Sequence, residues 1–311
     1  MIEGIKLTKT KDGKITTLVE KNFNEGLCVI ENDGKIYNDK ILDYLWWDET
    51  EYTPLELNKS FIFNDIFIFR SDNGVFEMSC KHFGENTERK SKFFDILRRW
   101  EHDKNFVCQT NPKRSLIYFM DNGGVAIFDG IRHKMKSETA DVYYEYDTKP
   151  LVMTQQEIFD GYFRKDVCVC NGLTYDVVEW FKENGEAITF FKDFVSSVCG
   201  DVTLTKDGYT RKSPYSIRDV PIIKLSGIEM PITNVPRNTR NIISMIYVIS
   251  WLFRERKYGK ELTNYNSNEL DDYVIMIGEN IIDNRNTLTK LIKFLNTKVN
   301  IQILALRGHN E

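Results

Sequence analysis

Two side chains that can transfer protons each follow a strongly apolar stretch near the C-terminus. Glu279 comes two residues after the run 273–277, and His309 comes after the run 301–306, 30 residues further along the chain. Short apolar runs of this kind predict buried strands. Open α/β sheets bind their ligands beyond the carboxyl ends of such strands. We therefore take Glu279 and His309 as candidate catalytic residues; the alternative is that each is an ordinary surface group.

A turn close to the N-terminus has the setting of a phosphate-binding loop. Residues 26–30 are apolar, 32–34 read Asn-Asp-Gly, and 38–47 carry apolar side chains at helical spacing, so we expect a strand, a turn and a helix. A phosphate loop needs glycines for close backbone approach, a lysine for the phosphates and a hydroxyl for Mg²⁺. The alternative is a plain turn.

Two registers of that loop are possible, and each supplies part of the chemistry. In one, Asn38 and Asp39 stand where the lysine and the hydroxyl are needed, and an aspartate there would repel a phosphate. In the other, Gly34 and Lys35 form the glycine–lysine pair, but Ile36 follows them. We name Gly34, Lys35, Asn38 and Asp39 as candidate nucleotide-binding residues.

The order of these segments resembles the ATP-binding heads of ABC type found in the RecF, SMC and OLD group. Those heads open with a phrase of the type NF…GLNVIxGxNGxGKST, which Asn22-Phe23, Gly26-Leu27 and Val29-Ile30 match here. The resemblance runs from residue 2 to residue 309 by layout. It implies an α/β fold with a mixed sheet, a parallel core and a helical lobe.

The resemblance also gives roles to later residues. The segment 227–253 is similar to the signature motif, with Pro236 and Asn238 at its usual serine and glycine, and Arg240 at a basic position of the helix start. We expect Asn238 and Arg240 to face nucleotide, Asn238 in the left-handed conformation that glycine normally supplies. The run 273–277 resembles the Walker B strand of these heads. The first acid that follows this strand in the family positions Mg²⁺, and here it is replaced by Gly278. The resemblance makes Glu279 the acid that activates water and His309 the switch histidine.

Four functional groups of the family are thus replaced: the loop lysine, its hydroxyl, the Mg²⁺ carboxylate and the signature glycine. The resemblance then implies a pseudo-ATPase, a binding or regulatory subunit that pairs with a second copy or with an active ATPase or effector. ATP and Mg²⁺ are the cofactors it implies, and bacterial genome maintenance or anti-phage defence the setting. One alternative is a genuine but atypical hydrolase that uses Asp39, Glu279 and His309 around a divalent ion. Another is a protein-interaction scaffold that binds no nucleotide.

The element pattern predicts one α/β domain over residues 1–311, with a helical insert at 150–200 and no long coiled coil, and the resemblance implies that this domain is an ABC-ATPase-like head. Strands are expected within 1–31, as a pair around the turn 71–74, and at 115–120 and 125–128 around Asp-Asn-Gly-Gly. Helices are expected at 91–102, after the capping box that begins at Thr154, at 174–182, at 187–198, at about 238–256 and at 286–296. The order β, helical insert, then βαβ favours one α/β unit.

Composition limits the partners that charge alone would attract. The 311 residues carry 42 basic and 46 acidic side chains, a formal charge of −4, and 41% are hydrophobic. This charge gives no global reason to bind nucleic acid or an acidic membrane, so nucleic-acid binding would need a local basic face, and we expect no membrane association. The basic candidates are Lys90, Lys92, Arg98, Arg99, Lys113, Arg114, Arg254, Arg256, Lys257 and Lys260.

Targeting and cysteine content favour the cytoplasm. No secretion signal is evident, and the longest apolar stretch, 242–253, has about 12 residues against the roughly 20 that cross a bilayer. Six cysteines are too sparse for a disulfide framework. We expect no metal site, and we interpret Cys168 and Cys170 as two small buried thiols of a short strand.

Overall fold

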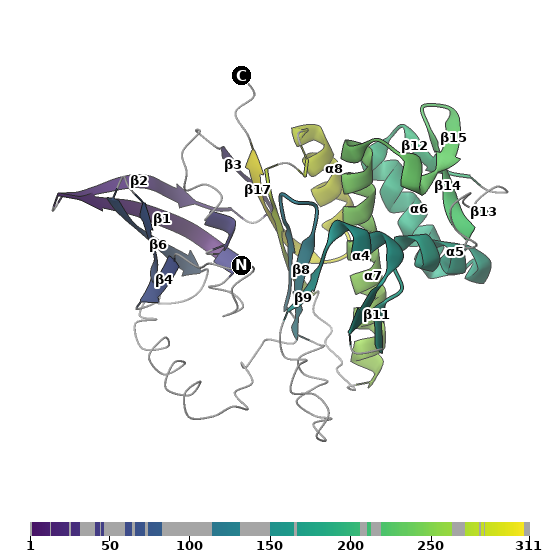
Figure 1. Ribbon diagram of the computed structural model, residues 1–311, viewed down its shortest axis with the longest axis horizontal. Helices are drawn as coiled ribbons and strands as arrows, with labels where there is room; N and C mark the ends of the chain where they lie inside the picture. Colours follow the sequence, from purple (N-terminus) through teal and green to yellow (C-terminus); the bar gives the residue numbers. More distant parts are fainter. Residues whose placement is uncertain are drawn as a thin grey trace.

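The computed structural model describes residues 2–12, 14–24, 26–31, 41–43, 45–46, 60–63, 66–71, 74–82, 114–130, 150–164, 167–205, 210–212, 219–262, 271–279, 281–282 and 284–307. These residues form a mixed α/β structure in three layers (Figure 1). An antiparallel sheet, a mixed sheet and a group of helices lie side by side, with the mixed sheet in the middle.

The outer sheet is antiparallel and has the strand order β2-β1-β6-β5-β4. Its strands are β1 (Ile2–Lys11), β2 (Lys14–Asn22), β4 (Ser60–Phe63), β5 (Ile66–Ser71) and β6 (Gly74–His82). The pair β5–β6 was expected. The stretch before it is two strands and not one, because Phe63 pairs back onto Ile66. The intervening Asn64-Asp65 is a dipeptide typical of turns.

The central sheet has six strands in the order β3-β17-β16-β7-β8-β9. They are β3 (Gly26–Glu31), β17 (Asn300–Arg307), β16 (Asp272–Ile277), β7 (Arg114–Phe119), β8 (Val125–Asp129) and β9 (Leu151–Met153). The first four are mutually parallel, and β8 and β9 are antiparallel to their neighbours. The expected mixed sheet with a parallel core is therefore confirmed.

Both faces of the central sheet are buried, which explains why its strands read as continuous apolar runs. Alternate side chains face opposite layers. In β16, Ile275 and Ile277 pack toward the helices, while Val274 and Met276 pack toward the antiparallel sheet. The helical residues 41–43 and 45–46, which include the fully buried Trp46, join the second of these cores.

Helices and short strands cover the other face of the central sheet (Figure 1). The helices are α4 (Gln155–Asp160), α5 (Leu173–Glu183), α6 (Glu186–Cys199), α7 (Arg237–Leu262) and α8 (Arg285–Leu295), with the 3₁₀ turn η2 (Ile232–Asn234). The short strands are β10 (Tyr162–Arg164), β11 (Val167–Cys170), β12 (Val202–Leu204), β13 (Thr210–Lys212), β14 (Asp219–Leu225) and β15 (Ile228–Pro231).

Local sequence signals fix several helix ends. Thr154 caps α4 in a capping box with Glu157, as expected, and Asn184 ends α5 in a left-handed conformation. The central helix α7 packs against α6, and all its residues from 243 to 252 are buried. No helix within the described ranges is long and apolar enough to cross a membrane. The helix expected at 91–102 lies outside the described residues.

The amino-terminal edge of the parallel strands is held by a buried ion-pair cluster. Arg256, near the end of α7, is 2% exposed and pairs with Asp129 at the end of β8 and, at 3.1 Å, with Asp271 before β16. Its guanidinium also donates to Ser115 Oγ at the start of β7 (2.8 Å). Burial alone would lower the pKa of Arg256, but Asp129, Tyr273 and Asp271 raise it above its ordinary value. The cluster thus ties α7 to three strands.

Candidate functional site

The opposite, carboxyl-terminal edge of the parallel strands is built around the end of β16. The backbone N–H of Gly278 donates to the carbonyl of Phe119 (2.8 Å), so β16 stays paired with β7 up to this residue. Glu279 follows immediately and is half-buried. Strand β16 therefore places Glu279 at the edge at which open α/β sheets bind ligands.

A second carboxylate reaches the same point from the neighbouring strand. Asp121 follows β7 in the tight turn to β8, in which Gly123 N–H donates to Met120 O (2.8 Å) and Gly124 N–H to Asn122 Oδ1 (2.8 Å). A Cβ atom built on Gly278 would overlap Asp121 Oδ1 and lie 3.0 Å from Asp121 Cγ. Only glycine fits at 278 without displacement of Asp121.

The sequence-based prediction of the site missed Asp121, because Asp121-Asn122-Gly123-Gly124 was interpreted as a hairpin signal alone. That interpretation of the turn is correct, since β7 and β8 pair antiparallel from Phe119 and Val125. The sequence signal for Asp121 is its position directly after the buried strand β7. If β7 is parallel to β16, the Asp121 carboxylate must lie at the same edge of the sheet as Glu279.

Two further strands end at this edge and lead toward the remaining predicted residues. The parallel pairing of β3 and β17 closes with Glu31 opposite Arg307. Gly34, Lys35, Asn38 and Asp39 follow β3 in sequence, and His309 follows β17; all five lie outside the described residues. Their assignment as nucleotide-binding and catalytic residues stays a prediction.

The structure places Asn238 and Arg240 in the first turn of α7. Asn238 is exposed and helical, so the expected left-handed conformation is wrong: the helix already begins at Arg237. The Arg240 guanidinium donates to the carbonyls of Thr233 (2.8 Å) and Val235 (3.3 Å). Arg240 therefore holds the entry loop of the helix, and its hydrogen bonds point back into the protein.

One side chain connects the start of α7 to the turn that carries Asp121. Gln155, the first residue of α4, donates through Nε2 to Oδ1 of the buried Asn241 (2.9 Å). The same amide lies over Gly123, where an added Cβ would come within 3.1 Å of Gln155 Cδ. Gln155 thus joins α7 and the β7–β8 turn, which the sequence-based reasoning treated as separate motifs.

The carboxylates at this edge are the kind of donors that Mg²⁺ uses. Mg²⁺ is commonly bound through one or two carboxylates together with substrate phosphates and water. The space beside Gly278 is filled by the carboxylate of Asp121, and Glu279 is the next residue of the chain. In the described ranges no group of three or more His, Cys, Asp and Glu side chains is arranged to hold a metal ion.

The basic cluster on α7 is engaged in ion pairs with the protein itself. Arg256 is buried in the cluster described above, and Arg254 pairs with Glu183 at 3.3 Å. Lys257 pairs with Glu186 at 2.9 Å and Lys260 with Asp271 at 2.8 Å. Each of these four cations thus has a carboxylate partner within the chain. Of the other six candidates, Arg114 begins β7 and the rest lie outside the described residues.

A buried polar network lies between α5, β11 and α7, on the helical side of the molecule. The Tyr247 hydroxyl donates to Asp176 Oδ2 (2.7 Å) and lies 3.2 Å from Cys170 Sγ, while Asn171 Nδ2 donates to Asp176 Oδ1 (2.9 Å). Burial raises the pKa of the Asp176 carboxyl, and it raises the pKa of the Cys170 thiol to about 11. Burial thus disfavours the charged form of each group, and the hydrogen bonds of the network link α5 to α7.

The two close cysteines do not share a face, contrary to the expectation of two buried thiols. Cys170 is 2% exposed, but Cys168 is exposed. The register of the β10–β11 hairpin shifts between Tyr162 and Phe163, so one residue of β11 is extra. A bulge of this kind turns successive side chains to new directions, which separates the two thiols.

Comparison with known proteins adds little to the geometry. No protein-family model matches the chain, and no curated protein matches its sequence. Forty-three chains of solved structures match. One is the "SmcHead bound to the C-winged helix domain of ScpA", at 12% identity and a TM-score of 0.35, covering 99% of this chain and 90% of that one. At this TM-score the likeness carries no argument about fold or function.

Proposed function

We propose that this chain is a degenerate ATP-binding head of ABC type, one domain with a helical lobe at 150–200, that acts as a binding or regulatory subunit. Support comes from the sheet: the strands that precede the loop-like turn, the Walker B-like Glu279 and His309 are β3, β16 and β17. They are parallel neighbours that end at one edge. The signature-like helix α7 reaches that edge through Gln155.

A single observation carries the non-hydrolysing part of the proposal. Hydrolysis in such heads needs a carboxylate on residue 278 to position Mg²⁺. Here that residue is Gly278, and no side chain fits there while Asp121 keeps its place. The acid has been lost in a way that a simple reversion would not repair, because Gly278→Asp would collide with Asp121.

The same observation favours a second candidate, an atypical Mg²⁺-dependent ATP hydrolase. Asp121 places a carboxylate next to the position that the family's acid would occupy, and Glu279 is retained as the group that would activate water. In this reading Asp121 and Glu279 hold the ion and the water between them. The third candidate, a scaffold that binds no nucleotide, remains an outcome of the same experiment.

Calorimetric titration with ATP and Mg²⁺, together with a phosphate-release assay, separates the three. The proposed function predicts saturable binding without turnover, and binding that weakens in Asp121→Asn. Turnover that disappears in both Asp121→Asn and Glu279→Gln would overturn it and establish the hydrolase. No heat of binding and no thermal stabilisation by ATP would overturn both and leave the scaffold.

The matched control is Glu229→Gln. Glu229 is an exposed acid on β15, which pairs with β14 on the helical side of the molecule. This substitution removes one negative charge without touching the carboxyl-terminal edge, so ATP binding should equal that of the unmodified protein.

We further propose a protein partner, either a second copy or an active ATPase or effector, in a genome-maintenance or defence complex. Sedimentation with and without ATP tests the pairing with a second copy.

A further inference from the structure

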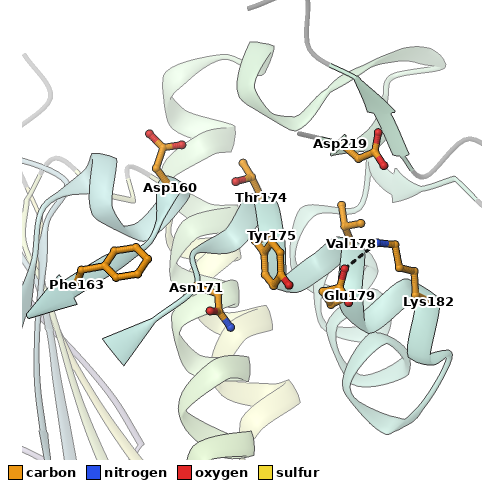
Figure 2. A pocket seen from close by; sticks show the side chains of 9 residues that line it. All are labelled: Asp160, Phe163, Asn171, Thr174, Tyr175, Val178, Glu179, Lys182 and Asp219. Carbon is orange, nitrogen blue, oxygen red and sulfur yellow. Dashed lines mark hydrogen bonds and ion pairs between the residues drawn. The ribbon is translucent and has the colours of Figure 1, made fainter. Parts of the chain in front are cut away.

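A cavity of about 270 Å³ opens on the helical side, between α5, β10 and the start of β14 (Figure 2). Its floor is made by Thr174 and Val178, both buried, and Thr174 Oγ1 is fixed by its bond to the carbonyl of Phe159 (2.8 Å). Asn171 forms one wall and is held by Cys168 (3.1 Å) and Asp176 (2.9 Å). The cavity is therefore preformed by side chains that already have partners.

Two aromatic rings border this cavity and are unusually exposed. Phe163 is 60% and Tyr175 46% exposed, and Figure 2 shows the Phe163 ring directed toward α5, where Tyr175 lies beside Asn171. Exposed aromatic side chains grouped around a hollow mark a site at which another molecule is bound. Aromatic faces also attract cations.

The charge around the cavity is negative. Asp160, Glu179 and Asp219 line it together with Lys182, so three carboxylates against one ammonium leave a formal charge of −2. Glu179 is paired with Lys182 at 2.7 Å. In Figure 2 the carboxylate of Asp160 lies on the Phe163 side of the cavity and that of Asp219 on the Val178 side. An anion would be repelled here and a cation attracted.

The volume limits what the cation is. Pockets for drug-sized ligands measure roughly 300–1,000 Å³, so this one, at about 270 Å³, suits a single long side chain. Guanidinium is planar, stacks on aromatic rings and is more weakly hydrated than an ammonium, so arginine fits two rings flanked by carboxylates better than lysine.

We propose that this cavity binds an arginine side chain presented by an extended segment of a partner protein. The guanidinium lies between Phe163 and Tyr175, and Asp160 and Asp219 balance its charge. This site is separate from the carboxyl-terminal edge of the sheet and does not depend on whether that edge binds nucleotide. It assigns a partner chemistry to the helical lobe: a basic segment.

The test is a titration of the full chain, labelled with ¹³C at valine methyl groups, with the capped peptide acetyl-Gly-Arg-Gly-amide. Val178 lines the cavity floor, and its methyl signals are identified with Val178→Ile. We expect a saturable shift with a dissociation constant on the order of 1 mM, because one cation–π contact and screened ion pairs are individually weak. The shift should shrink as ionic strength rises.

Comparison peptides and variants make the result decisive. A peptide with citrulline, neutral and of the same shape, should give no saturable shift, and one with lysine should bind more weakly. Phe163→Ala, at an exposed ring, should weaken arginine binding about two- to fivefold, and Asp160→Asn with Asp219→Asn should weaken it further. Tyr258→Ala removes an exposed ring of α7 that does not line the cavity and should leave binding unchanged.

Several outcomes would overturn the proposal. The first is the absence of a saturable Val178 shift with the arginine peptide. The second is equal binding of the citrulline peptide, which would mean that the cavity does not distinguish a charged side chain from a neutral one of the same shape. The third is an unchanged constant in Phe163→Ala. Tighter binding of spermine than of the peptide would assign the cavity to a free polyamine and not to a protein segment.

Discussion

Replacing Arg256 with methionine should cost about 3–5 kcal/mol of folding free energy, the usual range when one partner of a buried ion pair is removed. Both charges are almost inaccessible: Arg256 is 2% and Asp129 3% exposed. Methionine keeps most of the side-chain volume, so the loss is electrostatic. Asp271 keeps Lys260 at 2.8 Å, whereas Asp129 loses its cationic partner inside the protein.

The size of this effect can be read from thermal unfolding. An unfolding entropy of about 2.1 cal/mol/K per residue over 311 residues gives about 0.65 kcal/mol/K, so the melting temperature should fall by about 5–8 °C. Circular dichroism at 222 nm, followed on heating and in urea, measures it. The control is Lys257→Met on the same helix, which removes a pair that lies on the surface and should change little.

A double variant separates charge from packing. Asp129→Asn keeps an acceptor for Ser115 Oγ (3.0 Å) and removes the buried charge, so combining it with Arg256→Met should recover more than half of the loss. Additive losses in the double variant would mean that packing dominates. A loss under about 1 kcal/mol in the single variant, the size typical of an exposed pair, would refute the buried cluster itself.

Two further predictions concern the network and the site edge. Because burial raises the pKa of folded Asp176, its stabilising contribution is complete below the ordinary value of about 3.9 and is lost as pH rises through the folded pKa. Asp176→Asn should therefore gain stability relative to wild type in urea unfolding as the pH rises above about 4; a stability difference that does not change with pH would contradict this. Gly278→Ala should cost about 1–3 kcal/mol by displacing Asp121. Gly185→Ala, where a Cβ meets nothing within 4 Å, is its control, and equal costs would refute the overlap.

The sequence predicts most described elements because their signals are local. The capping box at Thr154, the turn before Val125 and the apolar runs of β16 and β17 each depend on a few neighbouring residues. Strand pairing is different, since periodicity does not say which strand adjoins which. The separation of β1, β2 and β4–β6 into a sheet of their own was therefore not predicted.

The residues of the candidate site also depend on long-range packing, which local sequence patterns do not predict. Glu279 was predicted because it follows an apolar run, and the edge at which it lies follows from the parallel neighbours of β16. Asp121 and Gln155 were not found, because each belongs to a different local motif, a turn and a helix start, whose functional position depends on long-range packing. The conformation of Asn238 was missed because the apolar pattern does not mark where α7 begins.

The carboxylates of Asp121 and Glu279 are carried by different elements at the carboxyl-terminal edge of the sheet. This difference determines how a partner could act on them. Glu279 is positioned by β16, a central strand paired on both sides, whereas Asp121 is positioned by a turn in contact with Gln155. Gln155 in turn bonds Asn241 of α7. A movement of the start of α7 therefore has a direct route to the turn that carries Asp121. Two acids on one strand keep a constant spacing, whereas two acids on separate elements have a spacing that a partner bound to α7 can change. This property fits the regulatory role proposed above, and comparing ATP affinity in Gln155→Ala and in Asp121→Asn tests whether the two residues act along one route.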